Sequence, residues 1–183
     1  VPTMASVLSG RQVGLRIVLL PYKFLLGHMV EQARSSIGLL AGTVHVESVD
    51  SSEITQEDIP TSLADDTLPA LLFLNLDAAA ILFRFHLERL QRWASRNILK
   101  KIYFDEIQQI ICESEFRSSY ERLRDLGRVG VPVICLSGSL PTSLSLPIMT
   151  YCRLMVPNQP QGNELVSGNG SSKNNAPRIF LYT

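Results

Sequence analysis

Hydrophobic residues in this sequence form short continuous runs separated by segments with helical spacing. The runs are typical of buried strands and cover residues 15–20, 43–46, 71–74, 101–104 and 131–136. Helices are predicted between them at residues 22–37, 79–94, 117–126 and about 141–150. Strands that alternate with amphipathic helices indicate an α/β fold with a mostly parallel central sheet and helices on both faces.

The composition fits one folded domain. The chain has 183 residues, 45% of them hydrophobic, with 17 basic and 17 acidic side chains. This argues against intrinsic disorder and against a simple, highly basic nucleic-acid binder. The net charge of zero results from two segments of opposite charge. Residues 47–66 carry seven acids and no Lys or Arg, whereas residues 84–101 carry six bases and one acid. Both segments can be solvated faces, or the basic one can contact phosphates.

Several kinds of site and segment are excluded by the sequence. Three cysteines without a C-x-x-C spacing and three histidines without paired spacing argue against a disulfide framework and a His or Cys metal site. The most apolar stretch, residues 68–85, is interrupted by polar residues, so no membrane span is expected. The chain begins with Val, so either the initiator was removed or this is a piece of something longer. From residue 157 onward the composition predicts a flexible linker or tail after a lobe at residues 1–156.

The candidate chemistry lies where buried strands are expected to end. Asp105 and Glu106 directly follow one strand, and Ser137 and Ser139 follow another. Such an acid pair suits a nucleotide hydrolase, in which the first carboxylate holds Mg²⁺ and the second orients or deprotonates the attacking water. The alternative is a helix cap or a solvated turn.

These segments resemble the motifs of superfamily-two helicases. Residues 103–108, Tyr-Phe-Asp-Glu-Ile-Gln, resemble the Walker B or DEAH-type box, and residues 136–141, Leu-Ser-Gly-Ser-Leu-Pro, resemble the third motif. Residues 18–22, Val-Leu-Leu-Pro-Tyr, are similar to motif Ia. Residues 72–77 align with the strand that normally ends in Thr-Pro-Glu, and residues 115–117 match the Phe-Arg-Pro segment of RecQ-like helicases.

The order and spacing of the motifs extend over residues 2–154 and resemble the first lobe of a fungal-type RecQ-like DNA helicase. That resemblance implies a three-layer RecA-like P-loop NTPase fold, ATP and Mg²⁺ as cofactors, DNA as partner and a nuclear location. The implied catalytic residues are Glu106 and Gln108. The implied nucleotide contacts are Thr3, Asp105, Ser137 and Ser139, with Asp105 also the Mg²⁺ ligand. The implied DNA contacts are Pro21, Tyr22, Lys23 and Asn75.

Departures from the family pattern bear on activity. Residues 2–8 read Pro-Thr-Met-Ala-Ser-Val-Leu where the family has Pro-Thr-Gly-x-Gly-Lys-Ser, and no G-x-x-x-x-G-K-[ST] occurs anywhere in the chain. The glycines and lysine that hold phosphates are therefore missing. The second helicase lobe, which carries the arginine finger, is expected to be absent and could be a separate partner.

Three hypotheses remain open from the sequence. The chain is a truncated or degenerate ATP-binding lobe of a helicase, inactive alone; or a non-catalytic platform for nucleic acid or protein that keeps the helicase fold; or an unrelated α/β protein whose acid pair is structural.

Overall fold

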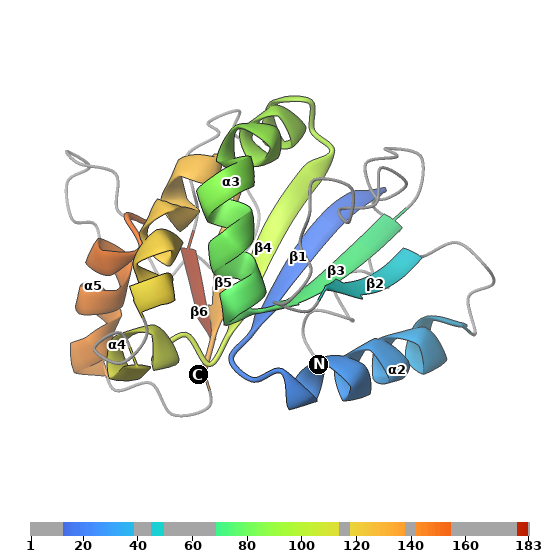
Figure 1. The fold of residues 1–183 in the computed structure, drawn as a ribbon, viewed down its shortest axis with the longest axis horizontal. Coiled ribbons are helices and arrows are strands. Elements are labelled where there is room, and N and C mark those ends of the chain that lie inside the picture. The colour runs from blue at the N-terminus through green and yellow to red at the C-terminus, as the bar shows by residue number, and fades with distance from the viewer. Residues whose placement is uncertain are drawn as a thin grey trace.

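A computed structural model shows six parallel strands in one sheet (Figure 1). It describes residues 13–38, 45–49, 69–113, 118–137, 142–154 and 179–182. The strands are β1 (Gly14–Leu20), β2 (His45–Val49), β3 (Pro69–Asn75), β4 (Leu99–Asp105), β5 (Val133–Leu136) and β6 (Ile179–Tyr182), in the spatial order β2-β3-β1-β4-β5-β6. The helices are α2 (Phe24–Gly38), α3 (Leu76–Ser95), α4 (Gln109–Glu113), the 3₁₀ helix η2 (Ser118–Val129) and α5 (Thr142–Tyr151).

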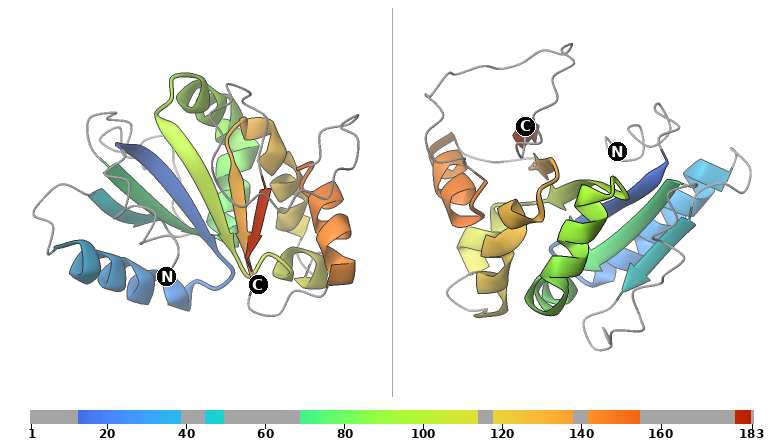
Figure 2. Two further views of the ribbon diagram at one scale, coloured as in Figure 1. Left: turned by 180° about the vertical axis from the view of Figure 1, so that it is seen from behind. Right: turned by 90° about the horizontal axis from the view of Figure 1, so that it is seen from above.

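The core lies on both faces of strand β1. All seven residues of this strand are buried, and it pairs with β3 on one side and β4 on the other. Its alternate side chains join two separate clusters, one with α3, η2 and α5 and the other with α2. Figure 2 shows helices on both sides of the sheet, which confirms the expected three-layer α/β architecture.

Helix α3 begins at a side-chain cap. The carbonyl oxygen of the Asn75 side chain accepts a hydrogen bond of 2.8 Å from the backbone N–H of Ala78, which satisfies one N–H group of the first turn. The helix buries Phe83, Leu90 and Trp93 against the sheet, as its apolar spacing predicts. It is kinked at His86, whose φ of −128° and ψ of 18° are not helical.

Most predicted elements are found, with three differences. The strand expected at 43–46 spans His45–Val49, and residues 117–126 were expected as a helix, whereas the observed element is a 3₁₀ helix, Ser118–Val129. The prediction of a flexible tail is wrong for Ile179–Tyr182, which pairs in parallel with β5 inside the sheet. Residues 155–178, the rest of the predicted linker, lie outside the described residues. Within the part of the chain that the structure describes, no helix is long and apolar enough to cross a membrane.

Helices η2 and α5 approach closely at a glycine. The backbone N–H of Gly127 donates to the carbonyl of Cys152 over 3.1 Å, and a Cβ at position 127 would lie 2.1 Å from the carbonyl oxygen of Arg153. The carboxylate of Asp125 accepts hydrogen bonds from Arg128 and Arg153 at 3.1 and 3.3 Å, which links the same two segments. Only glycine fits at position 127 without moving the backbone.

We predict that Gly127→Ala lowers the free energy of unfolding by about 1–3 kcal/mol, because the new methyl group overlaps backbone atoms that are held by the Cys152 hydrogen bond. Gly27→Ala is the matched control. A Cβ there meets nothing within 4 Å, so alanine in α2 should raise stability by roughly 0.5–1 kcal/mol. Urea unfolding of both variants measures the difference, and equal effects would contradict the close contact.

Candidate functional site

The carboxyl ends of four strands lie along one edge of the sheet. Leu20 at the end of β1 is in register with Asn75 at the end of β3, and Asp105 at the end of β4 is in register with Leu136 at the end of β5. Ligands of open parallel sheets bind outside this edge. The topology therefore brings together the segments that carry most of the predicted site residues.

Asp105 and Glu106 form a tight turn at the end of β4. Asp105 accepts a hydrogen bond of 3.1 Å on Oδ1 from the backbone N–H of Glu106. Burial raises the pKa of the Asp105 carboxyl, the neighbouring charge of Glu106 raises it further, and the hydrogen bond from the Glu106 backbone opposes both. Glu106 itself has a φ of 51°, in the left-handed region that costs a non-glycine residue about 1 kcal/mol.

Gln108 holds the carboxylate of Glu106. Its Nε2 donates a hydrogen bond to Oε2 of Glu106, so the two residues predicted to be catalytic contact each other. The other polar atom of the side chain, Oε1, is buried and has no hydrogen-bond partner among the described residues. A buried acceptor left in this state costs about 1–3 kcal/mol. The three polar residues of the turn thus form one connected group.

The acidic turn is joined to the end of β5. The backbone N–H of Ile107 donates to the carbonyl of Leu136 over 3.3 Å, directly before Ser137. Ser137 is 7% exposed. The structure therefore places this predicted nucleotide contact beside the acidic turn, as the third-motif resemblance implies. Ser139 and Thr3 lie outside the described residues, and the roles of all three stay predictions.

The segment after β1 presents aromatic rings to solvent. Tyr22 is 36% exposed and Phe24 is 77% exposed, and their rings stack with centroids 5.6 Å apart and an angle of 15°. Lys23 lies between them and is also exposed, whereas Pro21 is buried. Phe24 is the first residue of α2, and its ring stacks on Tyr22 and is exposed.

Asn75 has a structural use in the described chain. Its side chain is 3% exposed, and its carbonyl oxygen is the cap of α3. The predicted contact of Asn75 with DNA stays a prediction, but the cap alone accounts for an amide at this position. Among the predicted DNA contacts, Tyr22 and Lys23 are the exposed ones.

The residues at the carboxyl edge of the sheet suit the two implied cofactors, Mg²⁺ and ATP, to different degrees. The Asp105 carboxylate is a hard oxygen ligand of the kind that Mg²⁺ takes. No group of three or more His, Cys, Asp or Glu side chains that could hold a metal occurs in the described residues. The sequence has no Gly-Lys-Ser or Gly-Lys-Thr, so the backbone cradle and lysine that bind nucleotide phosphates are missing. Asp105 is therefore a residue type that suits Mg²⁺, whereas the given sequence carries no phosphate-binding motif for ATP.

Comparison with known proteins shows that the fold is similar to that of a solved helicase structure. No family model matches the chain, and no curated protein matches it. Fifteen chains of solved structures match. One of them is the crystal structure of the DUF1998 helicase MrfA bound to DNA, with a TM-score of 0.56 and 16% sequence identity over 83% of this chain. This chain corresponds to 21% of that helicase chain. The match supports the RecA-like α/β fold.

We predict that Asp105→Asn raises the melting temperature at neutral pH. The folded-state pKa lies above the ordinary value of 3.8, so the ionised carboxylate destabilises the fold, and this penalty grows as the pH rises through the folded pKa. Below the ordinary pKa, where both states are protonated, the variant and the wild type should melt alike. Thermal melts between pH 3 and 7 measure the effect.

Asp77→Asn is the control for that experiment. Asp77 lies in the first turn of α3, where a negative charge is favourable, so its loss should lower stability by about 0.3–1 kcal/mol at neutral pH. A lower melting temperature for Asp105→Asn at neutral pH would contradict the assignment of Asp105 as a destabilised carboxylate.

Proposed function

We propose that this chain is a degenerate first RecA-like lobe of a DNA helicase, which binds DNA at the carboxyl edge of its sheet and does not hydrolyse ATP alone. The observation that carries the proposal is the connected turn of Asp105, Glu106 and Gln108 at the end of β4. Its sequence resembles the helicase acid box, and the fold around it is similar to that of a helicase. The sequence around it lacks the phosphate-binding loop.

The DNA-binding part of the proposal is supported by the edge beside that turn. MrfA, whose fold is similar, was crystallised with DNA. In this chain the stacked pair of Tyr22 and Phe24 offers an exposed aromatic surface, and the exposed cation of Lys23 lies between the rings in sequence. Aromatic rings next to positive charge are typical of surfaces that bind single strands by base stacking.

The finer relationship to RecQ-like helicases is also a proposal. It rests on the order of the motif-like segments, from residues 18–22 to residues 136–141, and on the Phe-Arg at residues 116–117. A separate second lobe as partner and a nuclear location follow from the same relationship and carry no independent support from the geometry.

For the nucleotide, we predict that calorimetric titration with Mg·ATP shows no binding tighter than millimolar and that no phosphate is released. Each missing charge-assisted phosphate contact removes about 1.5–3 kcal/mol of affinity. Glu106→Gln is the control, because any ATPase that persists in this variant comes from a contaminant. Micromolar binding with turnover that depends on Glu106 would overturn this part of the proposal.

For DNA, we predict that Tyr22→Ala and Phe24→Ala each weaken binding of a fluorescent oligo-dT strand about fivefold or more, since stacking contributes about 1–3 kcal/mol per base. Fluorescence anisotropy at low salt measures the affinity. Leu146→Ala is the matched control, since Leu146 is an exposed apolar residue, 54% exposed, on α5. Equal affinities for all three variants and the wild type would remove DNA binding from the edge.

A further inference from the structure

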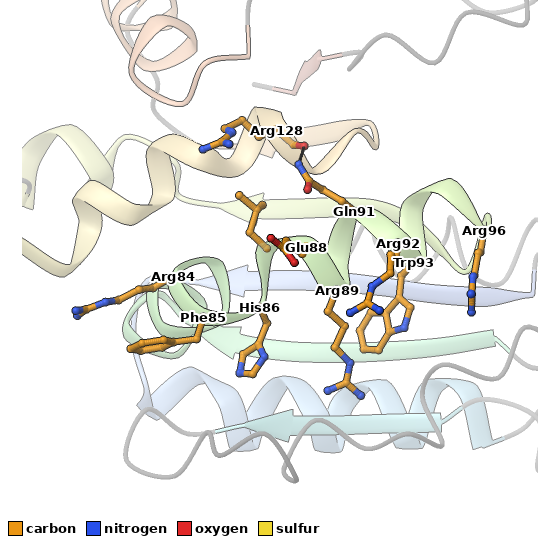
Figure 3. A pocket seen from close by; sticks show the side chains of 11 residues that line it. Arg84, Phe85, His86, Glu88, Arg89, Gln91, Arg92, Trp93, Arg96 and Arg128 are labelled. Atoms are coloured by element: carbon orange, nitrogen blue, oxygen red, sulfur yellow. Dashed lines mark hydrogen bonds between the residues drawn. The ribbon is translucent and has the colours of Figure 1, made fainter.

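The second half of helix α3 forms a groove rich in arginine. We call it the arginine groove; its volume is about 790 Å³. Figure 3 shows the side chains of α3 that line it, together with Arg128 of the neighbouring η2. The residues that carry the argument are Arg84, Phe85, Arg89, Arg92, Arg96 and Arg128.

Positive charge dominates this groove. Its lining includes five arginines and a single acid, Glu88. Arg128 forms an ion pair with Asp125 at 3.1 Å. Within the described part of the chain, no ion pair involves Arg84, Arg92 or Arg96. These charges therefore complement an anion from outside the described residues.

Aromatic rings lie among the arginines. Phe85 is 63% exposed, and the guanidinium of Arg84 lies 4.9 Å from the centre of its ring. The guanidinium of Arg89 lies 4.9 Å from the centre of the Trp93 ring. The exposed Phe85 ring contacts water unfavourably, and a stacked base would cover it. A guanidinium held over a ring is already ordered before it binds a ligand.

The arginines are spaced to follow a nucleic-acid strand. Arg92 and Arg96 are four residues apart and lie on one helix face, and Arg89, whose guanidinium lies over Trp93, precedes them on the same face. At 1.5 Å per residue they span about 10 Å. Three nucleotide steps of a stacked strand, at 3.4 Å each, cover about the same length.

The groove is well separated from the sheet edge that carries the acidic turn. Helix α3 starts at that edge, at Leu76, and runs back across the sheet toward Leu99, where β4 begins (Figure 1). The groove arginines of α3 extend from Arg84, two residues before the kink at His86, to the C-cap Arg96. The two surfaces can therefore be tested independently.

We propose that the arginine groove is a second nucleic-acid site, which binds a single strand through phosphate contacts to Arg84, Arg92 and Arg96 and through a base stacked on Phe85. Charge complementarity favours a polyanion, and the exposed ring favours a strand with unpaired bases over a duplex. The site goes beyond the proposed function, because it shares no residue with the Tyr22 and Phe24 surface.

The chain contains a natural reporter for this site. Trp93 is the single tryptophan in the sequence, and it lines the groove. Titration of the protein with an unlabelled 12-nucleotide oligo-dT strand should therefore change tryptophan emission. Because phosphate contacts release counterions, the affinity should fall steeply with salt, with a slope of about −0.7 per contact.

The test compares two double variants that remove the same charge. The double variant Arg92→Gln with Arg96→Gln removes two phosphate contacts. The slope of log affinity against log salt should therefore become less negative by about 1.4, and binding of the strand should weaken. Arg34→Gln with Arg122→Gln, at exposed arginines outside the groove, should leave the tryptophan response intact. Phe85→Ala should weaken binding of the strand about fivefold or more. Equal melting temperatures of the variants show that folding is unaffected.

The proposal is overturned if the two double variants bind alike, if a duplex binds more tightly than the strand, or if a poly-glutamate peptide of equal charge changes the emission as strongly. The Tyr22→Ala, Phe24→Ala double variant separates this site from the proposed function. If the groove binds a strand and the edge does not, the tryptophan response persists in this variant. The anisotropy of a labelled strand is then the same for this variant and the wild type.

Discussion

Burial of strand β1 on both faces is the constraint on which the rest of the fold depends. A strand with no exposed residue must be covered by helices on each side of the sheet, and its backbone must be paired on each edge. Parallel neighbours on both edges in turn require crossovers through helices. All strands then end at one side of the sheet. The segments after β1, β3, β4 and β5 therefore lie in one row, and this alignment does not depend on contacts between the segments.

The continuous apolar runs were enough to find this arrangement from sequence, because a strand buried on both faces contains few polar residues. The runs ending at Leu20, Phe104 and Leu136 all became adjacent strands. Other features depend on partners distant in sequence. The apolar residues Ile179–Tyr182 follow a long polar stretch and fall within the predicted tail, since only their pairing with β5 makes them a strand. The 3₁₀ geometry of Ser118–Val129 was not visible in an amphipathic pattern that fits either helix type.

The sequence predicts which residues follow the buried strands, but it does not predict which side chains are exposed, and the roles of these residues stay predictions. Asp105 and Ser137 were placed by the strands they follow. The exposure of Phe24 does not follow from the helical spacing, because the spacing does not show at which residue the helix begins. Asn75 was assigned a DNA contact, although an Asn before a helix is as typical of an N-cap, and the structure shows the cap.

The acidic turn is unusual because several unfavourable features meet in it. Burial and the adjacent Glu106 disfavour the charge of Asp105, and Glu106 has left-handed backbone geometry. Gln108 has a buried acceptor with no hydrogen-bond partner among the described residues. A turn that served only to connect β4 to α4 could avoid each of them with Asn, Gly and an apolar residue. Unfavourable local free energies of this kind concentrate at ligand sites, where interactions with the bound group offset them. These costs support the choice of the turn as the candidate ligand site, and its role stays a proposal.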